Sequence, residues 1–102
     1  MIIYNVTISV DRSVVDDWLQ WMRDVHIPEI METDLFNSYS LLRVMNDDDN
    51  PESLTYAVQY KLPSLEHYRS YKSDFAPAFR QKHEDRYGDR ATSFRTLLEE
   101  VL

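Results

Sequence analysis

Three histidines, His26, His67 and His83, are the residues of this sequence best suited to acid–base chemistry at neutral pH, because the ordinary pKa of imidazole is about 6.5. No two of them stand four residues apart with a carboxylate between them, so the spacing predicts no metal site. The chain has no cysteine, which excludes thiol nucleophiles and cysteine-ligated metals. A single glycine leaves no glycine-rich phosphate loop. Proton transfer or ligand binding by histidine is the chemistry that remains.

Seven tyrosines and an amide in the first apolar segment are the other candidate site residues. A tyrosine ring fills apolar space while its hydroxyl needs a partner, so a group of tyrosines suits a flat, partly polar ligand. For catalysis we predict that His26 moves a proton and that Asn5 or Tyr71 holds an oxygen atom of the substrate. The residues expected to line the same ligand site are Tyr4, Trp21, Tyr60, His67 and Tyr68. For each residue the alternative is a structural role, in the core or on the solvated surface.

The first element that must position these residues is a strand at residues 2–10, where apolar and polar side chains alternate. A helix follows, because Ser13 and Asp16 have the spacing of a capping box and apolar residues then recur every three or four positions. The apolar stripe of this helix consists of Val14, Val15, Trp18, Leu19, Met22, Val25 and His26. Pro28 disfavours helical geometry at Ile27, so the helix should end or bend there.

Two further strands are predicted at residues 35–46 and 53–62, the second with strict alternation of apolar side chains. The polar segment between them, Asn46–Pro51, has the composition of a turn. Its three consecutive aspartates lack the alternating ligands, central glycine and distal glutamate of an EF-hand loop. The segment is therefore interpreted as a solvated hairpin tip rather than a calcium site.

A second helix is predicted with Ser64 as its cap and with an apolar stripe that continues to Tyr87. Pro77 interrupts this stripe and should kink the helix or divide it in two. Gly88 stands where the end of a helix requires a left-handed residue, and residues 92–101 are predicted to form the last strand.

The order of elements is strand–helix–strand–strand–helix–strand, which predicts an α+β protein with the ferredoxin-like βαββαβ fold as a single domain over residues 1–102. In this fold two antiparallel helices cover one face of an antiparallel sheet. The end of the first helix should then lie near the start of the second, which groups His26 with His67 and the tyrosines at that end. His83 should lie at the opposite end of the helix layer.

The face of the sheet without helices carries apolar residues whichever strand parity it presents. The candidates are Ile3, either Tyr39, Leu41 and Met45 or Phe36, Leu42 and Val44, and either Leu97 or Phe94. Because contiguous exposed apolar surface usually marks an interface, we expect a homodimer in which two sheets pack face to face.

The formal net charge of −7 argues against binding nucleic acid or an anionic membrane through a basic surface. The charge is uneven, since residues 11–52 are mainly acidic and residues 61–95 carry an excess of bases. Salt links between the two halves are the main interpretation, and an anionic ligand near Arg80 or Arg86 is the alternative. No apolar run is long enough to cross a membrane and no signal peptide is evident, so a soluble cytoplasmic protein is expected.

Four segments carry a resemblance to known proteins: the opening strand MIIYNVTISV, the first-helix segment Trp18–Pro28, the start of the second helix at Leu65–Tyr71, and the closing Phe94–Glu99. Through them the whole chain resembles the dimeric α+β barrel proteins, which include the antibiotic-biosynthesis monooxygenase-like domains and small stress-responsive proteins. More narrowly, it is similar to a group of small bacterial proteins classed only as a domain of unknown function.

The resemblance implies a homodimer and a range of activities. Members include cofactor-independent oxygenases of polycyclic phenols, haem-degrading and haem-binding proteins, muconolactone-type isomerases, and proteins without a known activity. Some haem-degrading members carry an asparagine on the first strand, where this chain has Asn5, and a haem-ligating histidine on the second helix, where it has His67 and His83. We therefore expect a homodimer that binds, oxidises or isomerises a small hydrophobic aromatic molecule without a cofactor. The alternatives are a non-enzymatic interaction module and a haem-binding protein.

Overall fold

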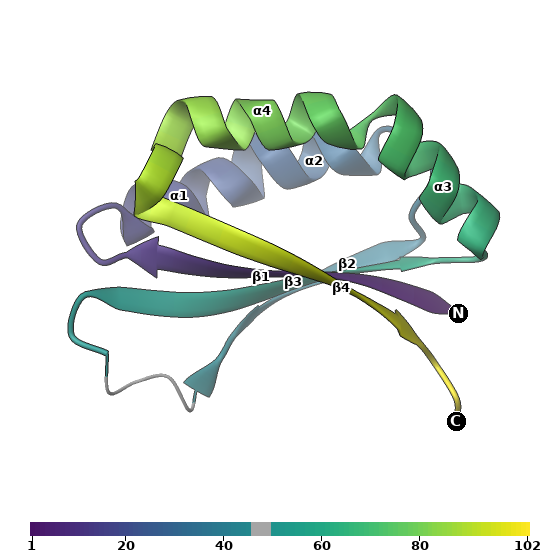
Figure 1. Cartoon of the computed structure of the whole chain (residues 1–102), viewed down its shortest axis with the longest axis horizontal. Coiled ribbons are helices and arrows are strands. Elements are labelled where there is room, and N and C mark those ends of the chain that lie inside the picture. The colour runs from purple at the N-terminus through teal and green to yellow at the C-terminus, as the bar shows by residue number, and fades with distance from the viewer. Residues whose placement is uncertain (46–49) are drawn as a thin grey trace.

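A four-stranded antiparallel sheet covered on one face by helices makes up the computed structural model of the chain, which describes residues 1–45 and 50–102 (Figure 1). The strands lie in the order β2-β3-β1-β4, with β1 (Ile2–Asp11) and β3 (Ser53–Leu62) at the centre. The edges are β2 (Ser38–Arg43) and β4 (Ala91–Glu99). This arrangement confirms the predicted ferredoxin-like α+β fold.

The aspartate-rich segment predicted to form a hairpin tip falls largely on residues 46–49, outside the described residues. Beyond it, the side-chain oxygen of Asn50 accepts the backbone N–H groups of Glu52 and Ser53 at 2.9 and 3.3 Å. These bonds are typical of a short polar side chain that caps the backbone just before a strand.

The first helical segment consists of α1 (Val15–Trp21), a π-helical turn η1 (Met22–His26) and α2 (Ile27–Met31). The helical path therefore continues past Ile27 instead of ending there. Ile27 donates its N–H to the carbonyl of Met22, five residues back, which is the wider π-type bond. A wider turn at this position relieves the clash of the Pro28 ring with the preceding turn, and Pro28 then sits in the first turn of α2, where its missing N–H costs nothing.

Two expectations for this helix are wrong. Ser13 is not its cap, because its N–H and its hydroxyl both donate to one carboxylate oxygen of Asp11, at 2.8 and 2.7 Å. Val14 occupies the cap position, without a side-chain bond. Val25 is exposed rather than part of the apolar stripe, since the π-helical turn shifts the phase of the helix; Met22 and His26, predicted in the same stripe, are buried.

The second helical segment follows its prediction closely. Ser64 caps α3 (Leu65–Asp74) by accepting the backbone N–H of His67. Pro77 lies in the first turn of α4 (Ala76–Tyr87), so the predicted stripe is divided into two helices. Gly88 has a φ of +53° at the end of α4, in the left-handed region that glycine adopts without strain, and opens the short 3₁₀ turn η3 (Gly88–Arg90).

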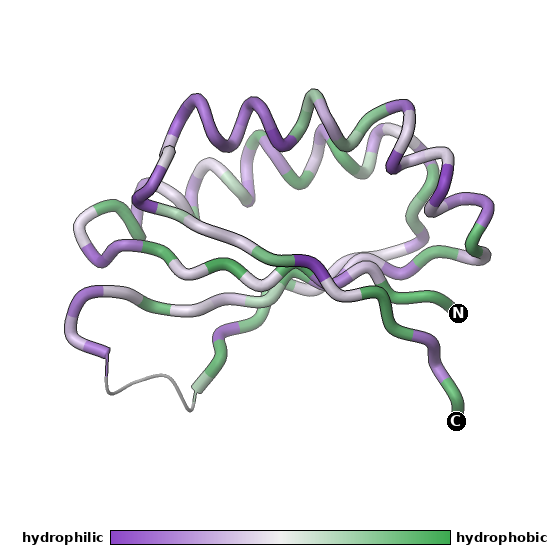
Figure 2. Tube along the Cα trace, viewed as in Figure 1, coloured by the Kyte–Doolittle hydropathy of each residue, from purple (hydrophilic) through white to green (hydrophobic). Residues whose placement is uncertain are grey.

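The core lies between the helices and one face of the sheet, and the tube in Figure 2 shows hydrophobic positions recurring along the strands and helices that enclose it. Alternation along β1 places Tyr4, Val6, Ile8 and Val10 on this face. The strand register sets Tyr4 opposite Tyr60 of β3 on one side and opposite Leu97 of β4 on the other. The helix-facing strand positions are thereby fixed across the sheet.

The same register decides which apolar residues lie on the open face. Ile3, Leu42, Phe94 and Leu98 share that face, and Phe94 is 64% exposed. Phe36 does not belong to it, because it precedes β2, is buried, and packs 5.1 Å from the ring of Tyr60 in the core. Between the apolar residues lie hydroxyls and amides from every strand, among them Asn5, Thr7, Ser40, Gln59 and Thr96. The open face is thus a mixed surface rather than a continuous apolar one.

Candidate functional site

A cavity of about 40 Å³ lies between the helix layer and the sheet, and we call it the His26 pocket. Strand residues from β1 and β3 line the pocket on the side of the sheet, and Met22, Ile30 and Phe79 line it on the side of the helices. The polar residues at its wall and mouth are Tyr4, His26, Tyr60, Tyr71, Arg80, His83, Ser93 and Arg95. The pocket therefore combines an apolar interior with titratable and hydrogen-bonding side chains, as small-molecule sites do.

His26 is buried in this pocket, with 7% of its surface exposed, and it makes no hydrogen bond within the described parts of the chain. Its ring stacks on Trp21 at a centroid distance of 4.5 Å and meets the ring of Phe79 edge-on at 5.9 Å. The Nδ1 atom is fully buried without a partner. A buried nitrogen without a partner costs about 1–3 kcal/mol, so it calls for a functional or structural reason.

Burial, followed by the charge of a neighbouring protonated His83, lowers the pKa of His26 from 6.5 to about 4. Lys82 and Arg95 act in the same direction, and Glu29 opposes them. His26 is consequently neutral at pH 7, where it can accept a proton or a hydrogen bond but carries no charge of its own.

His83 lies beside His26, with 5.9 Å between the ring centroids, and not at the opposite end of the helix layer as predicted. The prediction is wrong because the first helical segment continues through α2 to Met31, which leaves His26 in the middle of the helix pair instead of at its end. Trp18 donates its indole N–H to His83 Nε2 at 3.0 Å. Since indole only donates, Nε2 must be unprotonated and the neutral ring carries its proton on Nδ1. Burial, then Arg95, lowers the pKa of His83 to about 4.

Three of the predicted tyrosines meet at the pocket. The ring of Tyr4 lies 6.1 Å from that of Tyr60 and 5.6 Å from that of Tyr71. The hydroxyl of Tyr4 accepts a hydrogen bond from Arg95 Nε at 3.0 Å. Burial raises the pKa of both Tyr60 and Tyr71, so each hydroxyl keeps its proton at neutral pH and can donate to a ligand oxygen.

Two of the predicted site residues lie next to the pocket without lining it. The ring of Tyr68 lies 5.6 Å from that of Tyr4, and the ring of Trp21 lies 4.5 Å from that of His26, but neither residue lines the pocket. Both belong to the aromatic shell that holds the pocket residues in place.

Asn5 and His67 lie away from the pocket. Asn5 points to the open face of the sheet, opposite in parity to Tyr4, and its side-chain amide donates to the hydroxyl of Thr7 at 3.0 Å. His67 Nδ1 is 2.7 Å from Ser64 Oγ at the start of α3, where the two side chains form a hydrogen bond. Neither residue is brought close to His26.

The sequence analysis missed the contribution of the last strand. Ser93 and Arg95 share the helix-facing parity of β4 with Leu97, and both reach the pocket mouth. Neither residue was predicted as part of the site, because polar and apolar residues do not alternate cleanly along Ala91–Glu99 and the pattern carries little signal for which of them face the helices. Phe79 and His83, four residues apart on α4, present one face to the pocket in the same way.

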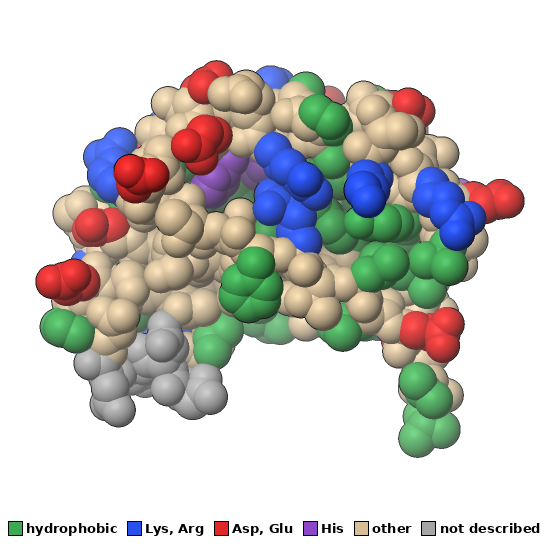
Figure 3. All heavy atoms as spheres, viewed as in Figure 1, with side chains coloured by type: hydrophobic (Ala, Val, Ile, Leu, Met, Phe, Trp, Pro, Cys, Tyr) green, Lys and Arg blue, Asp and Glu red, His purple; other side chains and the backbone are tan. Residues whose placement is uncertain are grey.

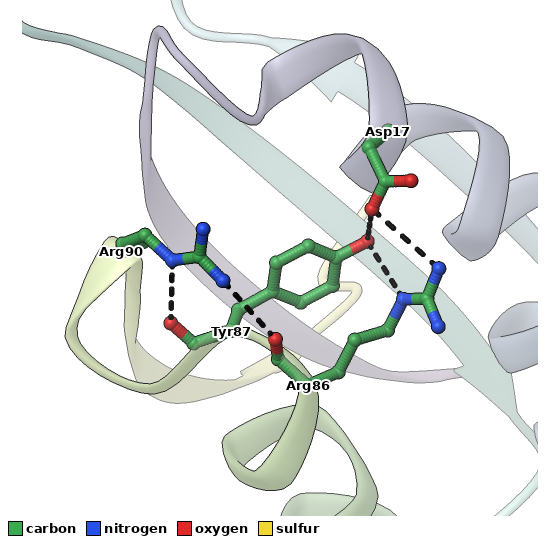
Figure 4. A network of polar contacts seen from close by, with 4 residues as sticks. All are labelled: Asp17, Arg86, Tyr87 and Arg90. Atoms are coloured by element: carbon green, nitrogen blue, oxygen red, sulfur yellow. Dashed lines mark hydrogen bonds and ion pairs between the residues drawn. The ribbon is translucent and has the colours of Figure 1, made fainter.

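A second polar cluster ties the end of α4 to α1, and we call it the Tyr87 network (Figure 4). The Tyr87 hydroxyl donates to the carboxylate of Asp17 at 2.7 Å and accepts from Arg86 Nε at 3.1 Å. Arg86 also pairs with Asp17 at 3.5 Å, and Arg90 donates to the backbone carbonyls of Tyr87 and Arg86. Together with the 2.6 Å pair of Lys82 and Glu29, this confirms the predicted salt links between the acidic and basic halves.

Within the described residues, no group of three or more histidine, cysteine, aspartate or glutamate side chains is arranged to hold a metal ion. No helix in those parts of the chain combines the length and apolar character that crossing a membrane demands. The polar chemistry of the site thus comes from histidine, tyrosine and arginine.

An α+β ferredoxin-like domain with a pocket between its helices and its sheet is the class of protein that these features define. A family model matches residues 1–101, and the chain belongs to that family, described as a domain of unknown function (DUF4286). No curated protein matches the sequence.

Two solved structures are similar to this chain in fold. One is described as an ethyl tert-butyl ether d (ethd) family protein from Bacillus halodurans, with a TM-score of 0.66, 11% identity, and 99% of this chain and 100% of that chain covered. The other is described as a dimeric ferredoxin-like protein from an uncultured marine organism, with a TM-score of 0.56, 13% identity, and 99% and 96% covered. Both likenesses support the fold and leave the activity open to inference from the site.

Proposed function

We propose that this protein is a homodimer that binds a small, partly aromatic molecule in the His26 pocket. The observation that carries the proposal is the buried Nδ1 of His26, which has no partner within the described residues. The atom has almost no accessible surface, so a ligand that displaces a neighbouring side chain and donates a hydrogen bond to it would remove this cost. The tyrosine hydroxyls at the pocket wall would then orient the oxygen atoms of the same ligand.

The size of the pocket limits what it accepts. An engineered apolar cavity of about 150 Å³ holds benzene, whereas the His26 pocket has about 40 Å³. An aromatic ligand therefore needs side-chain movement or must keep part of its volume outside. Haem is the less supported alternative, since sites for drug-sized ligands occupy about 300–1,000 Å³ and this pocket is far smaller. His67 is also bonded to Ser64 away from the pocket. Added hemin should give no Soret shift.

The activity that this site supports best, beyond binding, is proton transfer by His26. A neutral imidazole within an apolar pocket can take a proton from one atom of a substrate and return it to another, which is an isomerisation. Cofactor-independent oxidation of an aromatic by O₂ also starts with loss of a substrate proton. Tyr71 and Tyr60 supply hydroxyl donors for the oxygen atom that becomes negatively charged.

A screen of small aromatic molecules by ¹H–¹⁵N NMR tests the binding proposal. Ligands should shift the amide signals of Tyr4, Tyr71 and His83 in a saturable way. The variant His26→Leu, which removes the ring nitrogens at similar volume, should bind at least about tenfold more weakly. His67→Leu is the matched control, since it alters a histidine outside the pocket, and it should bind normally.

Three results would contradict the proposal: no ligand that shifts pocket signals, equal binding by both histidine variants, or shifts confined to the open face of the sheet. The last result would favour the alternative, an interaction module without a small-molecule ligand. Turnover of any bound molecule that survives His26→Leu would remove the proton-transfer role while leaving the binding site.

The homodimer is supported by the exposed apolar residues of the open face and by the dimeric description of one structural neighbour. We propose that a second copy covers this face, with the hydroxyls and amides between the apolar residues forming hydrogen bonds across the interface.

Light scattering should give twice the chain mass at micromolar concentration. Phe94→Glu should shift the mass to that of one chain, while Leu65→Glu, an equally drastic change on the exposed side of α3, should leave the dimer intact. A wild-type protein with the mass of a single chain would overturn the proposed homodimer.

A further inference from the structure

Resting on the proposed ligand site, we infer that the molecule bound there is a small organic carboxylate, whose body enters the His26 pocket with a hydrogen-bond donor for His26 while its carboxylate lies between Arg80 and Arg95. Both arginines line the mouth of the pocket, one from α4 and the other from β4. An anion site is thus assigned to two side chains that have no counter-ion among the residues the structure describes.

Arg80 and Arg95 have no acidic partner in the described parts of a chain whose net charge is −7. Two other bases of the same half pair with carboxylates, Lys82 with Glu29 and Arg86 with Asp17. Arg69, Lys72 and Arg90 also lack an ion pair among the described residues, but none of them lines the His26 pocket. What distinguishes Arg80 and Arg95 is that both line one pocket, where a single external anion can contact two cations.

The second argument is the way Arg95 is held. Its Nε donates to the hydroxyl of Tyr4 at 3.0 Å and its Nη1 to the hydroxyl of Ser93 at 3.3 Å. Both partners are neutral, so they fix the guanidinium at the pocket without cancelling its charge. Two of the five guanidinium protons are used, and the remaining ones stay available for a carboxylate, which arginine binds in a two-point geometry.

The third argument is the shape of the site beyond its mouth. The His26 pocket adjoins an open groove of about 510 Å³ between α4 and β4, and the two share Arg80, His83, Ser93 and Arg95. In Figure 3, basic side chains and a histidine gather along the boundary between the helix layer and the sheet. A ligand too large for the inner pocket can therefore keep its charged group in the groove, in contact with both arginines.

The other charged group at the groove is Glu84, which stands four residues after Arg80 on α4. It is not within ion-pair distance of either arginine in the described structure. Positive charge dominates at the pocket, since Arg80 and Arg95 line both the pocket and the groove, whereas Glu84 lines only the groove. A single carboxylate on the ligand matches this local charge, whereas a cation would be repelled by it.

The test compares carboxylates with their neutral amides of the same shape: butyrate with butyramide, and benzoate with benzamide. Binding is measured by ¹H–¹⁵N NMR titration of the intact protein at low salt. Each carboxylate should bind at least about tenfold more tightly than its amide, and its advantage should shrink as salt is added. In the variants Arg95→Gln and Arg80→Gln, carboxylate and amide should bind about equally. Arg80→Gln removes no hydrogen bond found in the described parts of the chain, so it serves even if Arg95→Gln is unstable.

Arg69→Gln is the matched control, because it removes the same charge from an exposed position of α3 outside both cavities and should keep the preference for carboxylates. If amides bind as tightly as carboxylates to the wild-type protein, the pocket binds neutral ligands and the inference fails while the proposed function stands. If the preference survives Arg80→Gln and Arg95→Gln, the anion lies elsewhere and the inference fails. If neither kind of probe binds, the proposed function fails with it.

Discussion

The Tyr87 network and the His26 pocket lie on the same helix, α4, but their polar groups are arranged in opposite ways. In the network, the Tyr87 hydroxyl and the Arg86 guanidinium both meet the carboxylate of Asp17. In the pocket, as far as residues 1–45 and 50–102 show, His26 has a buried nitrogen without a partner and Arg95 is bonded only to hydroxyls. Arg86 thus has a counter-ion within the Tyr87 network, whereas the pocket groups lack such partners among the described residues.

This difference separates stabilising polar groups from those available to a ligand. A hydrogen-bonded charge that meets its counter-ion contributes to folding, whereas a buried polar group left open costs stability that only function can justify. Substitutions in the Tyr87 network should thus lower stability without affecting ligand binding. Substitutions in the pocket should lower binding and leave stability unchanged or improved.

The largest effect is expected at Trp18, which follows Asp17 of the Tyr87 network on α1 and donates a hydrogen bond to His83 of the His26 pocket. Its side chain is fully buried, packs 5.2 Å from the ring of Tyr56 and holds His83 through its indole N–H. Trp18→Ala should lower the free energy of unfolding by about 3–5 kcal/mol, because it leaves a large cavity and removes the donor to His83. Urea unfolding at neutral pH measures the change. A loss below about 1 kcal/mol would mean that α1 is not anchored through this residue.

The next effect is a loss of stability in mild acid. His26 and His83 both have a pKa near 4 in the folded chain, against 6.5 for an exposed imidazole. Between these values the unfolded chain binds protons that the folded chain does not, so stability falls as the pH drops from about 6.5 towards 4. For His26 alone the full loss is about 3 kcal/mol, at 1.36 kcal/mol per pKa unit.

Urea unfolding at about pH 7 and pH 4.5 measures this loss. The carboxylates of Asp11 and Asp24 have lowered pKa values, held down chiefly by hydrogen bonds from Ser13 and Arg23, so they titrate below this window. The variant His26→Leu should therefore lose less stability on acidification than the wild-type protein. Equal losses in both would show that His26 is not the titrating group.

Removing one tyrosine hydroxyl from the Tyr87 network and one from the His26 pocket should change the free energy of unfolding by different amounts. Tyr87→Phe removes the donor to Asp17 and should cost about 1 kcal/mol of unfolding free energy. Tyr71→Phe removes a hydroxyl that has no hydrogen-bond partner in the described structure, so it should change stability by less than about 0.5 kcal/mol. Urea midpoints and NMR titration with benzoate distinguish the two. Equal costs would contradict the division between a bonded network and an open pocket.

Local features of the fold were predictable from the sequence because they depend on a few neighbouring residues. Pro77 divides the second helix and Gly88 ends it, since the first lacks an N–H and the second adopts a positive φ. The π-helical turn before Pro28 was not predictable in the same way. A proline can end a helix or be accommodated by a wider turn, and tertiary packing of Met22 and His26 decides between them.

The candidate site was predictable only in part, for a related reason. The group of Tyr4, Tyr60 and Tyr71 follows from strand alternation and topology, whereas the proximity of His83 to His26 depends on how far the first helical segment extends. The expectation that Asn5 and Tyr4 line the same site could have been corrected from the sequence alone. Tyr4 and Asn5 are neighbours on a strand, so their side chains point to opposite faces and cannot share a pocket.

The smallest effect is expected at Lys82, a paired base that lies close to the pocket. Its pair with Glu29 measures 2.6 Å, but the two side chains are 54% and 36% exposed, so water screens the interaction. Lys82→Met removes the ammonium, whose Nζ lies 5.5 Å from the centroid of the Phe79 ring, but keeps an apolar side chain of similar length, so it should cost no more than about 0.5 kcal/mol of unfolding free energy. The same change should raise the pKa of His26 slightly, because it removes the lowering effect of Lys82 while the raising effect of Glu29 remains; burial, His83 and Arg95 still hold the pKa down. An NMR titration of His26 measures the direction. A fall in the pKa of His26, or a stability loss above about 1 kcal/mol, would mean that this pair belongs with the stabilising network rather than with the electrostatics of the pocket.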